Sequence, residues 1–558
     1  MIQKQQGSAI YYSPDGYNTQ GKRLLGRQSA GEGFLKAYIE SHQGDTLYCY
    51  GDSDNDFRHF QQLVIPWLKK SFNFQLITKT QSYQLAEVGN LYLPGPSLAD
   101  FAWQRRFYDQ RGYSICGITH TIASKEAIGS IGNLLMAPIQ PWDALICTSN
   151  AVKVAVEKIL YDWGEYLGQR FNSKINLDLQ LPIIPLGVDA EKFQFNSEFR
   201  NTIRERLNIA EEDIVVLFVG RLIFYAKAHP VPMYLALEKA VKQISHKGKI
   251  VLIQCGWFED EREEASFIES AKEFAPSISY IFLNGKNPEI RQKIWSAGDI
   301  FISLADNIQE TFGLTPIEAM AAGLPVIVSD WNGYQESIRH EIDGFRISTM
   351  IPSENNALDL AHNYHIDQIN YSTYIAHACF ATMIDIDECT TALVKLIDNP
   401  DMRKKMGENG KQRVQDIYDW QNVIKSYHQL WKELEEIRNI KEMSVPIKNG
   451  NPPYPLCDDP FNLFNHYSTA HLSPEINLKL SSIVDDNFLK KIRTMWTTNF
   501  GNNYRLSNQI IDRIINDLKT HKILNVAYFI AVYGQENSNI LIRTLMYLLK
   551  FNILIIDS

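Results

Sequence analysis

Short apolar runs alternate with longer amphipathic segments along most of the chain. Segments such as residues 232–245 separate the runs and have the spacing of an amphipathic helix. Strands that alternate with helices form parallel sheets with right-handed crossovers. The pattern therefore predicts an α/β fold with two doubly wound, Rossmann-like domains that face a cleft. The runs that we interpret as buried strands are residues 8–12, 45–51, 113–119, 143–149, 181–187, 213–220, 249–256, 279–285, 299–305 and 324–330.

The domain boundaries follow from the grouping of these runs and from a change in composition. The two sets of strands meet between residues 188 and 212, and long amphipathic helices over 400–437 close the second set. Clustered prolines at 452, 453 and 455 indicate a linker. Beyond the linker, an apolar stripe (Ile510, Ile511, Ile514, Ile515 and Leu518) indicates a packed helix. We expect a first domain over 1–190, a second domain with closing helices over 191–442, a linker over 443–456 and a mostly helical accessory module over 457–558.

Composition excludes several classes of function. The chain has 558 residues, a net charge of -9 and a pI near 5.9, so it lacks the basic field that nucleic-acid binding needs. Its 7 cysteines are scattered without metal-ligand spacing, which indicates buried thiols and no metal site. No apolar run reaches the length of a membrane span, so we expect a cytoplasmic protein.

The segment 60–72 has two interpretations. It mixes Trp67 and Phe72 with Lys69 and Lys70, as an interfacial helix does, and it also fits a surface helix that packs on its own domain. Peripheral contact with the inner face of a membrane therefore stays open.

The stretch ETFGLTPIEAMAAGLPVIVSD, from Glu310 to Asp330, carries the strongest chemical signal. Glu310 follows the strand predicted over 299–305, at the sheet edge where open parallel sheets bind ligands. Gly313 has no Cβ, so the backbone can pass close to a ligand there.

A helix follows this glycine. We expect Thr315 as its N-cap, Pro316 at its first position, Glu318 closing a capping box, and Gly323 as its stop signal. The free amides of its first turn form an anion site. Both glutamates also have an interpretation without a ligand. Glu318 would then only cap the helix, and Glu310 would be a solvated carboxylate in a loop.

Five further residues lie where they can share this site. Arg221 and Lys227 follow the strand predicted over 213–220, and His120 ends the one over 113–119. Gly31 and Gly33 fall in 26–38, which we interpret as a glycine loop leading into a helix. Each residue also has a structural alternative. Arg221 and Lys227 would then be solvated cations, and His120 would be a structural histidine at a strand end. Gly31 and Gly33 would form a simple tight turn.

Taken together, these motifs resemble the retaining glycosyltransferases of family 4, which have the glycosyltransferase-B fold. Their signature is Glu, seven residues, Glu, with FGL after the first glutamate and a helix and strand after the second. The resemblance implies that Glu310 holds sugar hydroxyls, that Glu318 binds the ribose, and that Arg221 and Lys227 bind the diphosphate. It also implies roles for His120 beside the reacting sugar carbon and for the glycine loop of Gly31 and Gly33 at the diphosphate. The intervening loop, whose amides meet the diphosphate, is Thr311, Phe312, Gly313 and Leu314.

One feature departs from the family pattern. There are five residues between Arg221 and Lys227 where the common pattern has four, so His229 is an alternative second cation. The Asn332-Gly333 step after the next strand either borders the nucleotide or is a simple turn.

The resemblance implies front-face transfer of a sugar from a nucleotide-diphosphate donor to a hydroxyl acceptor, with retention and without cofactor or metal. The acceptor is a glycan, a lipid-linked molecule or a protein, and a nucleic-acid partner is not expected. Residues 457–558 are open to a protein partner or to self-association. The alternatives are a sugar-nucleotide epimerase or phosphorylase of the same fold, and a non-catalytic scaffold with a partner-binding C-terminal module.

Overall fold

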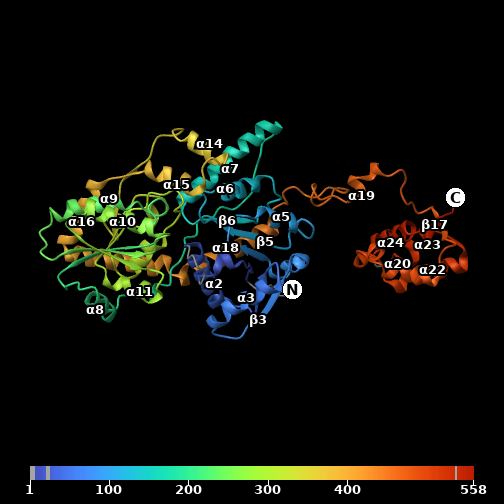
Figure 1. Cartoon of the computed structure of the whole chain (residues 1–558), viewed down its shortest axis with the longest axis horizontal. Coiled ribbons are helices and arrows are strands. Elements are labelled where there is room, and N and C mark those ends of the chain that lie inside the picture. The colour runs from blue at the N-terminus through green and yellow to red at the C-terminus, as the bar shows by residue number, and fades with distance from the viewer. Residues whose placement is uncertain (1–6, 20–25, 535–536, 558) are drawn as a thin grey trace. The chain divides into compact units, whose positions relative to one another are not determined.

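The computed structural model describes residues 7–19, 26–534 and 537–557. The chain divides into two compact units, Met1–Pro455 and Leu456–Ser558 (Figure 1). The first unit contains two six-stranded parallel sheets, and the second unit contains a small antiparallel sheet with helices. The α/β fold class predicted from the sequence is therefore confirmed.

The first sheet has the strand order β3-β2-β1-β4-β5-β6, and all of its pairs are parallel. Helices α2 (Gly26–Ser41) and α3 (Asp54–Val64) share a core with one face, and α5 (Ala99–Arg105), α6 (Lys125–Gly132) and α7 (Asn150–Phe171) share a core with the other. The strands are β1 (Ala9–Tyr11), β2 (Thr46–Tyr50), β3 (Asn73–Ile77), β4 (Asn90–Leu93), β5 (Ser114–Ile118) and β6 (Ala144–Ile146).

The second sheet repeats this topology, with the order β12-β11-β10-β7-β8-β9 and parallel pairs throughout. Helices α9 (Pro230–Val241), α10 (Glu261–Phe274) and α16 (Ile386–Asp398) gather on one side of it (Figure 1). The chain turns back between β7 and β10, so a crevice for ligands is expected at their carboxyl ends. The strands are β7 (Ile214–Val219), β8 (Ile250–Gly256), β9 (Ser279–Asn284), β10 (Ile300–Ser303), β11 (Val326–Ser329) and β12 (Gly344–Ile347).

Helix α18 (Trp420–Ile440) returns from the second domain to pack on α2 and β5 of the first. Trp420 fits there because it faces two glycines, Gly33 and Gly187, where a Cβ would overlap its indole ring. The Trp420 amide donates to the Val188 carbonyl at 3.0 Å, which joins the crossover to the helix start. The last helix therefore ties the two domains of the first unit together.

The strand prediction was wrong at residues 181–187, and it missed three strands of the two parallel sheets. Pro182 and Pro185 remove backbone donors from that run, which makes one isolated bridge, Cys147 to Ile183. The missed strands β3, β4 and β12 are short, and charged or polar residues interrupt their apolar pattern.

In the second unit, β15 (Asn477–Leu480) pairs antiparallel with β16 (Ile523–Asn525) and β17 (Leu554–Ile556). Helix α22 (Asn508–His521) leads into β16, and α24 (Ser538–Lys550) leads into β17 in the same way. A residue with positive φ lies between each helix and its strand: Lys522, at 65°, directly follows α22, and Asn552, at 54°, lies two residues beyond the end of α24. The unit thus contains a structural repeat that the sequence did not reveal. The apolar stripe predicted on α22 is buried, except that Ile510 is partly exposed.

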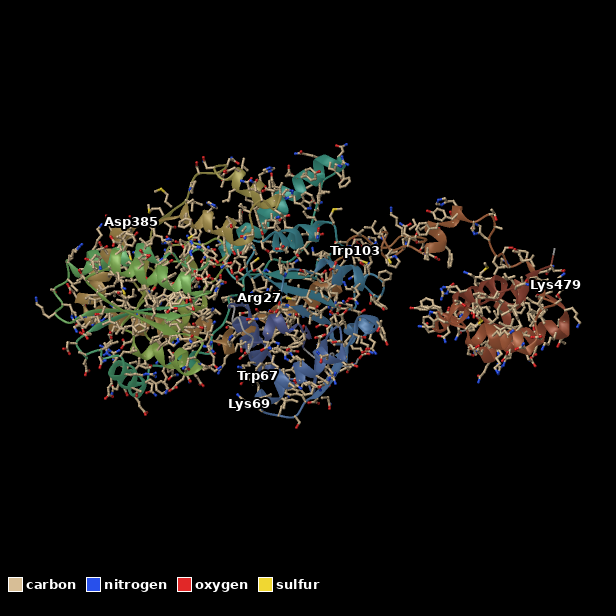
Figure 2. All side chains as sticks on the ribbon, viewed as in Figure 1. Arg27, Trp67, Lys69, Trp103, Asp385 and Lys479 are labelled. Carbon is tan, nitrogen blue, oxygen red and sulfur yellow. The ribbon has the colours of Figure 1, made fainter. Side chains whose placement is uncertain are left out.

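The segment 60–72 packs on its own domain. Phe60 and Val64 are buried in α3, and Trp67 lies under the Lys36 ammonium at 4.5 Å. Lys69 pairs with Glu40 at 2.9 Å, and Figure 2 labels Trp67 and Lys69 on this part of the domain. Within the described ranges, we find no helix with the length and apolar character of a membrane span.

Candidate active site

The candidate site lies at the switch point of the second sheet. Arg221 and Lys227 follow β7, Glu310 follows β10, and these two strands are hydrogen-bonded neighbours. The Lys227 Nζ forms an ion pair with Glu310 Oε2, and the two side chains are only 14% and 17% exposed. The structure therefore brings together one predicted cation and one predicted carboxylate from loops far apart in sequence.

Opposite charges keep this pair ionised in spite of burial. Burial disfavours the Lys227 ammonium, but the adjacent Glu310 carboxylate outweighs that effect and raises the pKa of Lys227. Burial alone would raise the pKa of Glu310, whereas Lys227 and then Arg221 lower it below its usual value. The half-buried Arg221 guanidinium donates to the Ala226 carbonyl at 3.4 Å. The site thus holds two cations around one carboxylate.

The extra residue between Arg221 and Lys227 is absorbed in a turn. The Lys227 amide donates to the Ile223 carbonyl at 3.1 Å, which closes one helical turn. The side chains of Asn307 and Gln309 then donate to carbonyls of the same turn, Gln309 to Ala226 at 2.5 Å. Lys227 consequently reaches Glu310 without the family spacing.

His229 has a different environment. Its ring accepts the Val231 amide at 3.4 Å as the N-cap of α9 and packs edge-on against Phe224 and Phe380. Burial lowers the pKa of His229, which disfavours the cationic form. Of the two alternatives, Lys227 has the geometry of the second cation.

The predicted capping box on the next helix is wrong. Helix α12 (Leu314–Ala321) has Gly313 as its N-cap, at φ 83°, with no side-chain cap hydrogen bond from any described residue. The hydroxyl of Thr315, the predicted cap, is buried and has no hydrogen-bond partner in the described part of the chain. The first-turn amides of α12 are therefore left for a ligand or solvent. At the other end Gly323, at φ 82°, ends the helix as predicted, with Leu324 donating to the Ala319 carbonyl at 3.0 Å.

Glu318 lies in the second turn of α12 and does not cap it. Its half-buried carboxyl makes no hydrogen bond to any other described residue. Burial raises the pKa of Glu318 to about 7, against the opposing effect of Lys227 and Arg291. A carboxyl that is neither a cap nor an ion-pair partner is available to accept ligand hydroxyls.

Asp306 is another buried carboxyl that follows β10, and the sequence analysis missed it. It accepts the His229 amide at 3.3 Å, and burial raises its pKa to about 7. Its position directly after the strand predicted over 299–305 was the available signal.

The loop that carries Glu310 is held in place by three residues that follow β11, namely Asn332, Gly333 and Tyr334. Asn332, at φ 42°, donates through its amide to the Glu310 carbonyl at 2.8 Å. A Cβ at Gly333 would lie 2.8 Å from the Phe312 Cα, and a Cβ at Gly313 would overlap the Tyr334 ring. The Asn332-Gly333 turn therefore supports the loop, and Tyr334 explains the glycine at 313. The sequence analysis missed Tyr334.

The intervening loop reaches the first domain through its backbone. The Ser149 hydroxyl donates to the Thr311 carbonyl at 3.0 Å, and the Thr121 hydroxyl donates to the Gln309 carbonyl at 3.2 Å. Phe312 is buried beside Tyr418, so its side chain belongs to the core, and Leu314 is partly buried against the same core. Thr311, Phe312, Gly313 and Leu314 thus lie together at the start of α12, with backbone groups as their contribution.

His120 directly precedes Thr121, so it lies on the edge of the first domain that touches this loop. Burial lowers the pKa of His120 to about 4, and the Arg27 guanidinium adds to the effect. The imidazole is therefore neutral at neutral pH and can accept or donate a hydrogen bond.

The predicted glycine loop over 26–38 is wrong, because these residues form helix α2. A Cβ at Gly31 would overlap the Gly16 carbonyl oxygen, and a Cβ at Gly33 would overlap the Trp420 indole. Both glycines permit close packing against the protein, and neither faces a space for a diphosphate.

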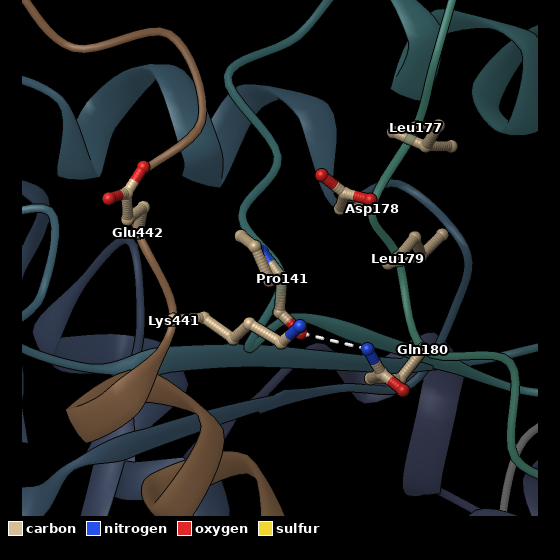
Figure 3. A pocket seen from close by; sticks show the side chains of 7 residues that line it. All are labelled: Pro141, Leu177, Asp178, Leu179, Gln180, Lys441 and Glu442. Carbon is tan, nitrogen blue, oxygen red and sulfur yellow. Dashed lines mark hydrogen bonds between the residues drawn. The ribbon is translucent and has the colours of Figure 1, made fainter.

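A pocket of about 480 Å³ lies elsewhere in the first unit (Figure 3). It is lined by Pro141, the segment 177–180, Lys441 and Glu442, and Gln180 donates to the Pro141 carbonyl at 3.0 Å across it. None of the candidate site residues lines it. The candidate site is therefore defined by its side chains and its position on the second sheet, and this pocket is not part of it.

Residues 199–359 match the family described as glycosyl transferases group 1. An uncharacterized glycosyltransferase of Methanocaldococcus jannaschii is 22% identical over 336 residues, which are 59% of this chain and 73% of that protein. The lipopolysaccharide 1,2-N-acetylglucosaminetransferase of Salmonella typhimurium is 25% identical over 182 residues, 32% of this chain and 46% of that one. The crystal structure of Anabaena HepE with UDP and glucose aligns with a TM-score of 0.49 at 14% identity, over 76% of this chain and 100% of that one.

Proposed function

Because residues 199–359 carry the group 1 glycosyltransferase segment on a two-sheet fold, we propose that this chain is a retaining glycosyltransferase. It transfers a sugar from a nucleotide-diphosphate donor to a hydroxyl acceptor and needs no metal ion. The donor binds the second domain, and the acceptor enters from the first. Within this proposal the family 4 motif assigns Glu310 and Glu318 to the donor.

The observation that carries the proposal is the grouping of Arg221, Lys227 and Glu310 beside the uncapped start of α12. A departing nucleotide diphosphate gains negative charge, which two cations and free helix amides can stabilise together. Charge-assisted hydrogen bonds contribute about 1.5–3 kcal/mol each, enough for such a set to replace a metal ion. Glu310 is then free to accept sugar hydroxyls while Lys227 moves toward the phosphate.

The remaining roles follow from position. The amides of Thr311 to Leu314 face the diphosphate, and Glu318 accepts the ribose hydroxyls in its ionised form. His120 contributes a neutral imidazole beside the reacting carbon. In front-face transfer the departing phosphate oxygen takes the acceptor's proton as the new glycosidic bond forms on the same face. The protein then supplies orientation and excludes water.

A donor screen with product analysis tests the function. The purified chain is incubated with UDP-, GDP- and ADP-sugars and a mixture of oligosaccharide and alkyl-glycoside acceptors, with and without EDTA. We expect an acceptor-dependent product whose anomeric configuration, read by NMR, equals that of the donor, at an unchanged rate in EDTA.

The alternatives give different outcomes. Inversion at the anomeric carbon would contradict retention, and loss of the rate in EDTA would contradict metal independence. A new nucleotide sugar without any acceptor would indicate an epimerase, and a phosphate-dependent reaction would indicate a phosphorylase. Failure of every nucleotide sugar to bind in calorimetry would favour the scaffold alternative.

A further inference from the structure

The second unit presents three large aromatic side chains to solvent from one short segment. Trp496, Phe500 and Tyr504 are 76%, 72% and 67% exposed, and the first two rings meet edge to face at 5.3 Å. Residues 494–504 contain no Asp, Glu, Lys or Arg, although 21% of the chain is charged. Aromatic groups gathered in this way mark a binding surface.

The backbone that carries these rings is fastened to the body of the unit. The Thr498 hydroxyl donates to the Ile492 carbonyl at 2.7 Å. Arg505 lies 3.7 Å from the centre of the Tyr547 ring and donates to the Asn499 side chain at 3.0 Å. The segment is therefore held from behind while its rings point outward, an arrangement that lowers the entropy lost on binding.

Neutral polar residues lie between the rings along the segment. Thr497, Asn502 and Asn503 are exposed, and their side chains make no hydrogen bond to another described residue. The surface thus offers aromatic faces and neutral donors and acceptors, and no charge inside the segment attracts a phosphate, a carboxylate or an acidic or basic peptide. A sugar ring matches this chemistry, because it has an apolar C–H face and a rim of neutral hydroxyls.

We propose that residues 494–504 bind a neutral oligosaccharide, and that this ligand is the glycan chain on which the enzyme acts. The first half of this statement stands on the surface alone. The second half rests on the proposed function, since only a glycosyltransferase has a glycan acceptor. Binding by the second unit would hold the acceptor on the protein between transfers and favour long acceptors over short ones.

Affinity electrophoresis of the full chain tests the binding. Native gels are cast with amylose, dextran, yeast mannan, a β-glucan or a galactan, and mobility is compared with a gel without polysaccharide. We expect at least one polysaccharide to retard the chain, and the Trp496→Ala/Phe500→Ala variant to lose at least about tenfold in affinity. The Asn502→Ala/Asn503→Ala variant removes only the amides and should weaken retardation while every ring remains.

The matched control is Trp163→Ala/Tyr166→Ala, which removes an exposed stacked pair from α7 in the first unit. It should leave retardation unchanged. Wild type that runs freely in all five gels, or equal loss in the control, would overturn the proposal. So would a change in oligomeric state, by light scattering, in Trp496→Ala/Phe500→Ala without any loss of retardation, since the rings would then bind a second copy.

The two proposals fail separately. Retardation without any sugar transfer would count against the proposed function alone. Transfer without retardation would count against the glycan surface alone.

Discussion

Lys227 and Glu310 form an ion pair although 83 residues separate them in the chain. They meet because β7 and β10 are neighbours at the turning point of the second sheet, so the loops that follow both strands share one edge. In the proposed function the donor binds at this edge, so the two partners would separate when a diphosphate takes the ammonium of Lys227.

The first prediction distinguishes the catalytic from the structural part of this pair. Lys227→Met should lower the transfer rate by about 10²–10³-fold, because one diphosphate cation is lost. It should also cost about 3–5 kcal/mol of unfolding free energy, since Glu310 is left as a buried, unpaired carboxylate. Urea unfolding and initial rates measure the two effects.

The double variant Lys227→Met/Glu310→Gln is the control for this experiment. It removes both charges, so most of the stability should return while the rate stays low. A double variant that recovers its rate along with its stability would show that the pair acts only on folding.

The second prediction concerns the glycines of α2. Gly33→Ala should destabilise the chain by about 1–3 kcal/mol, because the added Cβ overlaps the Trp420 indole. Gly26→Ala, in the same helix with nothing within 4 Å of its Cβ, should leave stability nearly unchanged. Both variants should bind donor with the wild-type affinity once folded, as measured by calorimetry. Weaker donor binding by a fully folded Gly33→Ala would restore the predicted role of this glycine at the diphosphate.

The packing of Gly33 is an example of a contact that the sequence alone could not predict. A Gly-x-Gly step after a first strand fits a ligand loop as well as a helix that packs closely on a distant tryptophan. Trp420 follows Gly33 by several hundred residues, and nothing local indicates that α18 returns to the first sheet. The fold class was predictable because short continuous apolar runs record burial in a parallel sheet, whereas contacts between distant segments leave no such pattern.

The start of α12 was also mispredicted because of a contact with a residue from another segment. Thr-Pro-x-Glu is a valid capping pattern, yet α12 begins at Leu314 because Gly313 can adopt a positive φ and Tyr334 occupies the space beside it. Local propensity placed the end of the helix correctly at Gly323. Its beginning was decided by a side chain from the next strand's loop, which the sequence alone does not locate.

The third prediction uses the pKa of Glu318, which burial raises from its ordinary value of 4.5 to about 7. Between these values the folded chain holds a proton that the unfolded chain releases, so stability falls as pH rises from about 4.5 to 7. For this group the loss is at most ~3 kcal/mol. Glu318→Gln should flatten the profile and be more stable than wild type at pH 8, measured by urea unfolding at pH 5 to 8. Burial also raises the pKa of Asp306, so this carboxyl lowers stability with rising pH in the same way. Part of the pH dependence of stability should therefore remain in Glu318→Gln.

Donor binding gives the complementary test of Glu318. Glu318→Gln should bind donor more weakly than wild type at pH 8, because a carboxylate accepts ribose hydroxyls better than an amide does. Equal donor affinities, together with a flatter stability profile, would leave Glu318 with a burial effect and no ligand.

The fourth prediction compares the glycines at the two ends of α12. Gly313 and Gly323 both have a positive φ, 83° and 82°, so alanine at either position adds backbone strain of at least about 1–2 kcal/mol. Gly323 has nothing within 4 Å of its Cβ position, whereas a Cβ at Gly313 overlaps Tyr334. Gly313→Ala must therefore displace the loop that carries Glu310, and misplacement of a catalytic group by an ångström can cost about 100-fold in rate. We expect equal rates for wild type and Gly323→Ala in steady-state assays and a loss of that size for Gly313→Ala; equal losses in both variants would mean that helix stability, and not the position of Glu310, limits the reaction.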